Sequence, residues 1–140
     1  MNPPSVEAVL RAYVEVWCEP DSARRAELLD LCWSDESEVI GPGYRFKGRK
    51  AVLDEVARFL REQPGFRPVL TSGFDTHGRW VRFAFVMLNP QDEIVDEGWD
   101  FVELATDGRI ARVISFWGKL PPPPGNLPAR VLPPFSRTPS

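Results

Sequence analysis

Asp100 is the one ionisable side chain on its face of the apolar segment from Gly98 to Leu104, if that segment is a strand with regular alternation. Burial disfavours the charged form of a carboxyl group. An aspartic acid in an apolar pocket can therefore stay neutral and donate a hydrogen bond to a substrate oxygen, where it stabilises developing charge. We take Asp100 as the candidate polar anchor or general acid of a small-molecule pocket.

The sequence leaves two interpretations of Asp100 open. In the first, its side chain faces an apolar pocket. In the second, it lies on a solvated face of the sheet, or it pairs with a nearby arginine such as Arg82 or Arg112. Only the first interpretation desolvates the carboxyl group and gives it a role in chemistry.

The chain has a single histidine, His77, and two cysteines, Cys18 and Cys32. His77 precedes Gly78 at an expected hairpin tip, which favours a solvated turn residue, and a place at the pocket rim is the alternative. The two cysteines are too far apart for a redox pair, and we expect both to be small buried hydrophobic side chains. We predict no metal site and, in the absence of a phosphate-binding glycine loop, no cofactor.

Helical spacing of apolar residues dominates the first half of the chain. Ser5 and Asp21 are suitable caps for the first two helices, because their side-chain oxygens can accept hydrogen bonds from the first turn. The third helix ends where Pro64 and Gly65 break the pattern. The predicted helices are residues 5–18, a second helix after Asp21, and a third from near Gly48 to Pro64.

Strand-like runs fill the second half of the chain. Before them, a short extended piece at residues 38–40 precedes the break Gly41-Pro42-Gly43. The later runs are separated by turn residues and indicate an antiparallel meander. They are Arg67–Phe74, Arg79–Leu88, Glu93–Leu104 and Arg109–Trp117.

Helices followed by a meander indicate an α+β fold. About three N-terminal helices are expected to pack on one face of a curved, mostly antiparallel sheet, and the concave face then encloses an apolar pocket. Residues 1–120 form this domain. Residues 121–140 begin with four consecutive prolines and are predicted to be an extended or partly disordered tail.

The charge and hydropathy of the chain exclude two classes of partner. A net charge of −3 without a clustered basic surface argues against binding to nucleic acid. No apolar run approaches the roughly 18–20 residues that cross a bilayer, so no membrane association is expected. The N-terminus lacks the profile of a signal peptide, and we expect a cytoplasmic protein.

The order of the elements resembles that of the nuclear transport factor 2-like superfamily, especially its SnoaL-like and ketosteroid-isomerase-like branches. The resemblance also rests on the turn Asp107-Gly108-Arg109-Ile110, which leads into Ser115-Phe116-Trp117-Gly118. It covers roughly residues 5–118 and implies a cone-shaped fold whose helices close a deep apolar cavity against the sheet. This scaffold is shared by isomerases, cyclases, epoxide hydrolases and non-enzymatic binding modules, so function must be argued from the site. The Arg-x-Asp pair of the epoxide hydrolases is absent from the sequence.

The resemblance implies that Asp100 works with a tyrosine, and that the base of the related isomerases is missing from this chain. In the ketosteroid-isomerase-like branch a protonated aspartate stands eight residues before a turn glycine, as Asp100 stands before Gly108. That acid works with a tyrosine on the first helix, which Tyr13 matches by position, although Tyr13 as a core residue with a satisfied hydroxyl is the alternative. The branch places its proton-shuttling aspartate in an Asp-Pro step, where this chain has Gly41-Pro42, so the usual base is absent.

We expect bulky side chains from the first helix and the meander to form the cavity walls: Trp17, Phe83, Phe85, Val113, Ser115 and Trp117. The leading hypothesis is a pocket protein for a small apolar carbonyl or hydroxyl compound. In its enzyme version, an isomerase, cyclase or lyase uses Asp100 as general acid or oxyanion donor and Tyr13 as second donor. The alternative is a non-catalytic ligand-binding or dimerisation module with a filled cavity. The resemblance also implies a homodimer.

Overall fold

The computed structural model describes residues 4–125, and its first two helices begin at the predicted caps. The side chain of Ser5 accepts a hydrogen bond from the backbone N–H of Ala8, and that of Asp21 accepts one from Arg24. Each cap satisfies a backbone donor that the first helical turn leaves without a partner. The helices are α1 Val6–Val16, α2 Ser22–Cys32 and α3 Arg49–Glu62.

The strands of the described region form one sheet. Their order is β2-β1-β7-β6-β5-β3, and β4 pairs with the first part of β5. All neighbouring pairs are antiparallel except β1 and β7, so the sheet is mixed and mostly antiparallel, as predicted. The strands are β1 Trp33–Gly41, β2 Tyr44–Lys47, β3 Arg67–Leu70, β4 Asp75–His77, β5 Trp80–Leu88, β6 Ile94–Leu104 and β7 Ile110–Trp117.

The N-terminal strands differ from the sequence-based expectation. The short extended piece at residues 38–40 is part of a nine-residue strand, β1, which forms a hairpin with the unpredicted β2. Gly43 has a φ of 77° in the turn between them, a backbone conformation that glycine adopts without strain. β1 also lies parallel to β7, where Trp33 is opposite Ile110 and Glu38–Ile40 are opposite Arg112–Ile114, with an irregularity between these two stretches.

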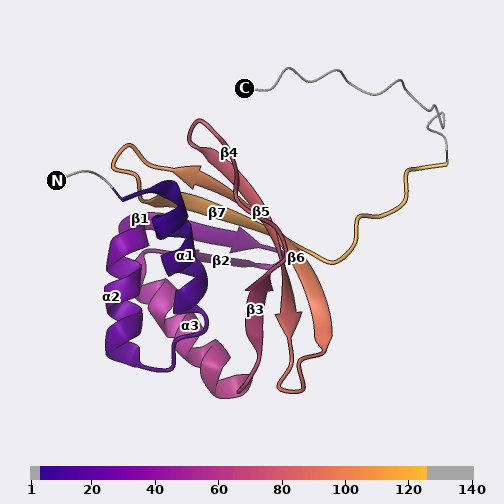
Figure 1. Ribbon diagram of the computed structural model, residues 1–140, viewed down its shortest axis with the longest axis horizontal. Coiled ribbons are helices and arrows are strands. Elements are labelled where there is room, and N and C mark those ends of the chain that lie inside the picture. Colours follow the sequence, from indigo (N-terminus) through magenta and orange to yellow (C-terminus); the bar gives the residue numbers. More distant parts are fainter. Residues whose placement is uncertain (1–3, 126–140) are drawn as a thin grey trace.

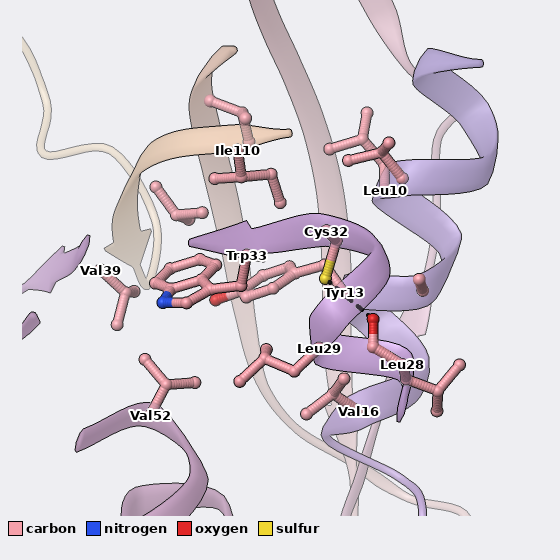
Figure 2. Close-up of a cluster of buried hydrophobic side chains, with 14 of the residues drawn as sticks. Leu10, Tyr13, Val16, Leu28, Leu29, Cys32, Trp33, Val39, Val52 and Ile110 are labelled. Atoms are coloured by element: carbon pink, nitrogen blue, oxygen red, sulfur yellow. Dashed lines mark hydrogen bonds between the residues drawn. The ribbon is translucent and has the colours of Figure 1, made fainter. Parts of the chain in front are cut away.

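All three helices lie on one side of the curved sheet (Figure 1). The core fills the space between them, and Figure 2 shows side chains of α1, α2, β1 and β7 meeting there. Leu10, Leu29 and Ile110 are completely buried, and each contributes about 1.5–3 kcal/mol by leaving water. Tyr13 stacks on Trp33 with their ring centroids 5.6 Å apart, so the first helix is fixed against the start of β1.

Side chains of β6 alternate between the two faces of the sheet, as the sequence pattern predicts. Asp100 and Val102 are buried on the face that carries the helices, which we call the inner face. Trp99 and Phe101 point to the opposite, outer face and are exposed. This alternation separates one acidic residue from the aromatic residues on either side of it.

Three further expectations have different outcomes. Cys32 is buried as predicted, but the prediction for Cys18 is wrong, because Cys18 follows Trp17, the C-cap of α1, and is exposed. Within residues 4–125, no helix is both long and apolar enough to cross a bilayer. Most of the predicted tail, residues 126–140, lies outside the described residues.

Candidate functional site

A cavity of about 310 Å³ lies against the inner face of the sheet, walled by α1, α3 and strands of the sheet. Its apolar lining comes from Val14, Trp17, Val39, Phe46, Phe59, Pro68, Leu70, Phe83, Phe85, Met87 and Trp117. Its polar lining comes from Tyr13, Tyr44, Glu55, Arg58, Asp100 and Ser115. A mostly apolar wall with a few polar groups is typical of a small-molecule site.

Asp100 is held by its cross-strand neighbours on the inner face. Asp100 lies on β6, opposite Phe83 of β5 on one side and Ser115 of β7 on the other. Ser115 donates a hydrogen bond from Oγ to Oδ1 of Asp100 at 2.6 Å. Burial raises the pKa of Asp100 to about 6, and the bond from Ser115 offsets part of that rise.

The arginines that the sequence offered as partners of Asp100 are engaged elsewhere. Arg82 donates to Asp75 at 2.6 Å, and Arg112 donates to Glu38 at 2.9 Å. Both arginines occupy outer-face positions, because they alternate with inner-face residues along their strands. Among the described residues, Asp100 therefore has a hydroxyl partner and no cationic one.

Tyr13 is both a core residue and a lining residue of the cavity. Its ring is buried against Trp33 (Figure 2), and the side chain also contributes to the cavity wall. Burial raises the pKa of Tyr13 well above its usual value, and the charge of Asp100 raises it further. The hydroxyl therefore stays protonated and can act as a hydrogen-bond donor close to Asp100.

Five of the six predicted wall residues line the cavity: Trp17, Phe83, Phe85, Ser115 and Trp117. Val113 does not, because it is completely buried between Val39 and Val102 in the packed part of the inner face. His77 is exposed in β4, opposite Trp80, and is not among the lining residues.

Several lining residues were missed by sequence reasoning. Tyr44 and Phe46 line the cavity from β2, which the sequence analysis did not predict. Their signal was the alternation of aromatic and basic residues in Tyr44–Lys47 directly after a Gly-Pro-Gly break, a pattern typical of a hairpin strand. Glu55 and Arg58 reach the cavity from α3, where a helical pattern alone does not reveal the neighbouring void.

The two charged lining residues of α3, Glu55 and Arg58, form an ion pair with each other. Arg58 is half exposed and forms ion pairs with Glu55 and with Glu62. Asp100 is thus the charged lining residue without an ionic partner in the described chain. Residues 4–125 contain no group of three or more His, Cys, Asp and Glu side chains arranged to hold a metal ion.

Comparison with known proteins finds relatives by structure. No family model matches the sequence, and no curated protein matches it. A proposed isomerase of the SnoaL-like family from Agrobacterium tumefaciens superposes with a TM-score of 0.74 at 29% sequence identity. The match covers 79% of this chain and 95% of the Agrobacterium chain.

More distant structures share the same architecture. A protein of unknown function with an NTF2-like fold, from an Exiguobacterium species, matches with a TM-score of 0.62 at 18% identity, over 80% of this chain and 99% of its own. A proposed polyketide cyclase from Sinorhizobium meliloti matches with a TM-score of 0.61 at 15% identity, over 76% and 92%. The chain has the nuclear transport factor 2-like fold, and its structural neighbours include SnoaL-like and ketosteroid-isomerase-like proteins.

Proposed function

We propose that this chain binds a small, largely apolar molecule bearing a carbonyl or hydroxyl group, and acts on it as an isomerase, cyclase or lyase. Asp100 is the general acid or oxyanion donor of the proposal. One observation carries it: Asp100 is a desolvated acid on the wall of an apolar cavity, with a hydroxyl and no cation beside it. Groups with shifted pKa values in a cavity are enriched at functional sites.

The protonation of Asp100 defines what it can do. With a pKa of about 6, the group is neutral and donates a hydrogen bond below that pH, and it is an anionic acceptor above it. A neutral acid in an apolar setting stabilises negative charge that develops on a carbonyl oxygen. Tyr13 supplies a second donor, because its raised pKa keeps the hydroxyl protonated. The activity should therefore fall as the pH rises through about 6.

The size of the cavity supports binding over a filled core. Its volume of about 310 Å³ lies at the lower end of the range of small-molecule pockets, roughly 300–1,000 Å³. A bicyclic aromatic or alicyclic ligand is of a suitable size. The similarity to a proposed SnoaL-like isomerase supports chemistry of the isomerase or cyclase type.

Non-catalytic ligand binding is a second candidate function, and the glycine at residue 41 favours it. Related isomerases are expected to place a proton-shuttling carboxylate here, and this chain has a glycine. Proton abstraction beside a carbonyl has no assigned base in this cavity. Turnover by the wild-type protein distinguishes the two candidates, because a pure binding module retains the ligand unchanged.

The proposal is tested by a thermal-shift screen of steroid-like, aromatic-ketone and polyketide-like compounds, followed by turnover assays of those that bind. A ligand whose free concentration is one hundred times its Kd stabilises the folded state by about 2.7 kcal/mol. For compounds that are turned over, Asp100→Asn should retain binding and lose about 10²-fold or more in kcat, because the amide cannot transfer the proton. Asp100→Ala should lose at least as much. Wild-type turnover in both variants would exclude the catalytic role.

We also propose that two copies pair through the outer face of the sheet. Figure 1 shows the helices on the other side, and large apolar side chains are exposed on the outer face. Phe101 and Phe116 pack edge to face there with ring centroids 5.7 Å apart, while Trp80 and Trp99 are 48% and 42% exposed. A contiguous apolar surface of this kind is typical of a protein–protein interface.

Light scattering tests the pairing. The wild-type protein should have the mass of a dimer at micromolar concentration, and Phe116→Arg should give a monomer, because an arginine in the centre of an apolar interface loses hydration without a partner. Leu120→Arg is a matched control, since Leu120 is exposed beyond the last strand. A monomeric wild-type protein would exclude the dimer.

A further inference from the structure

A second tyrosine, Tyr44, lines the cavity from the edge hairpin. It stands at the start of β2, where β1 pairs it with Gly41. Its hydroxyl accepts a hydrogen bond at 3.0 Å from the indole N–H of Trp117, which also lines the cavity. The feature joins the edge of the sheet to its central strand β7 at the cavity wall.

The bond from Trp117 determines which hydrogen bond Tyr44 still has to offer. An indole nitrogen is a donor only, so the phenolic oxygen must be the acceptor of this bond. The phenolic proton is left over. Among the described residues, no group accepts a hydrogen bond from it. Tyr44 therefore has a free hydroxyl donor at the wall of an apolar cavity, where an oxygen of a ligand would have few competitors for its hydrogen bond.

The position of the Tyr44 ring depends on the glycine at residue 41. A Cβ atom built at Gly41 would overlap the end of that ring, including the hydroxyl. The two residues compete for one space, and any side chain at residue 41 would displace Tyr44. The absence of a side chain at residue 41 thus leaves the space that the Tyr44 phenol ring occupies. Phe46 stacks on the ring from the next inner position of β2, with centroids 5.6 Å apart.

Trp117, which donates the hydrogen bond to Tyr44, is also fixed by its packing. Trp117 packs edge to face against Phe85 with centroids 5.0 Å apart. Phe85 in turn lies over Gly98, where an added Cβ would overlap its ring. The donor that orients the Tyr44 hydroxyl is therefore fixed by packing before any ligand arrives, which reduces the entropy lost on binding.

We propose that Tyr44 is a ligand-contacting residue that donates a hydrogen bond to an oxygen of the bound molecule, at a point separate from Asp100. The proposal rests on the binding function proposed above and specifies its ligand as one with two oxygen functions. Ser115, which holds Asp100, and Trp117, which holds Tyr44, are successive inner-face residues of β7. Their Cα atoms are about 7 Å apart, from the rise of a strand. A ligand with two oxygens can therefore contact both groups, which line the same cavity.

Three probes of nearly equal shape test the assignment: tetralin, α-tetralone and 6-hydroxy-α-tetralone, which carry no, one and two oxygens. Dissociation constants are measured by calorimetry for the wild-type protein and for Tyr44→Phe, which removes only the hydroxyl. Affinity of the wild type should rise along the series. Tyr44→Phe should weaken the two-oxygen probe about 3- to 10-fold and leave tetralin unchanged, since a neutral hydrogen bond is worth a factor of this size.

Phe46→Leu is the matched control, because it alters the wall beside Tyr44 without removing a polar group. It should weaken all three probes by similar factors. Equal affinities of Tyr44→Phe and the wild type for all probes would overturn the assignment of Tyr44 and leave the binding function standing. Failure of the wild type to bind any probe would overturn the proposed ligand class and this inference together.

A ligand-free measurement tests the geometry separately. The Trp117 indole N–H resonance, identified by its loss in Trp117→Phe, should move upfield in Tyr44→Phe because its hydrogen bond is lost. Gly41→Ala should produce a similar shift by displacing the ring, and Tyr44→Phe serves as the milder variant if Gly41→Ala does not fold. An unchanged resonance in Tyr44→Phe would overturn the orientation on which the free donor depends.

Discussion

Asp100 and Glu38 are both buried carboxyl groups, and they lie on opposite faces of the same sheet. Asp100 is 6% exposed on the inner face, and Glu38 is 4% exposed on the outer face. Glu38 accepts hydrogen bonds from Arg45 at 2.7 Å and from Arg112 at 2.9 Å. Asp100 accepts one from the neutral hydroxyl of Ser115.

The two surroundings shift the two pKa values in opposite directions. Hydrogen bonds from its arginines hold the pKa of Glu38 below its usual value, against the effect of burial. Burial raises the pKa of Asp100 to about 6, because no cation offsets the loss of hydration. Burial alone therefore does not determine the charge of a carboxyl group. The partners do, and only one of these two acids lacks an ionic partner.

The difference indicates which acid is structural and which is functional. An ion-paired glutamate fixes β1, β2 and β7 against one another on the outer face. An unpaired acid on a cavity wall destabilises the fold at neutral pH and is useful only if it meets something else, such as a ligand oxygen. The stabilities conferred by the two acids should therefore depend on pH in opposite ways.

Asp100→Asn should produce the largest effect, a gain in the free energy of unfolding of up to about 3 kcal/mol at pH 8. The folded protein holds the Asp100 proton up to about pH 6, whereas an unfolded aspartate releases it near 3.8. Stability conferred by the neutral acid is therefore present below about pH 4 and is lost as the pH rises to about 6. The difference of roughly two pKa units corresponds to about 3 kcal/mol.

Urea unfolding of Asp100→Asn and the wild-type protein at pH 4 and pH 8 measures this difference. The two proteins should have similar stabilities at pH 4, because folded Asp100 is neutral there and the pH is only slightly above the unfolded pKa of 3.8, so ionisation of the unfolded chain costs the wild type little. A variant less stable than the wild type at pH 8 would show that Asp100 is solvated or paired, and would remove the contrast with Glu38.

Ser115→Ala should have the next largest effect, a loss of about 1–2 kcal/mol at pH 8. The hydroxyl of Ser115 is the described donor to Asp100, and its bond favours the charged form. Without it the pKa of Asp100 should rise above 6, which carbon-13 NMR titration of the carboxyl group can follow. The stability loss should be smaller in the Asp100→Asn background. A pKa that stays at 6 or falls would contradict the assigned bond.

The sequence predicted the inner position of Asp100 well, because the alternation of side chains is a local property of a strand. Which residues would lie opposite Asp100 was harder to predict. The β6–β7 pairing shifts register at Glu103 and Leu104, so the pairing of Asp100 with Ser115 follows from an irregularity that no local pattern reveals. The same registers place Arg82 and Arg112 on the outer face, which separates them from Asp100.

Tyr44 was missed for a related reason. The four residues of β2 alternate aromatic with basic side chains, and this short run was not assigned to any helix or strand. Their assignment as a strand depends on pairing with β1, a tertiary contact. The role of Gly41 was likewise invisible, because the sequence records that a carboxylate is absent but not that a tyrosine from the next strand takes its place.

Glu38→Gln should have the smallest of the three effects and the opposite dependence on pH. The folded pKa of Glu38 is lowered, so its contribution to stability is present above the unfolded value of 4.5 and is lost as the pH falls through the folded value. At pH 7 the variant should lose about 1 kcal/mol, since Arg45 and Arg112 are largely hydrated and regain water when the charge is removed. High salt should reduce the loss further, because it screens pairs that reach the surface. Urea unfolding at pH 3 and pH 7 gives the comparison with Asp100→Asn. Glu38→Gln should reduce stability only where Glu38 is charged and paired with its arginines. Asp100→Asn should raise stability only where Asp100 is charged without an ionic partner.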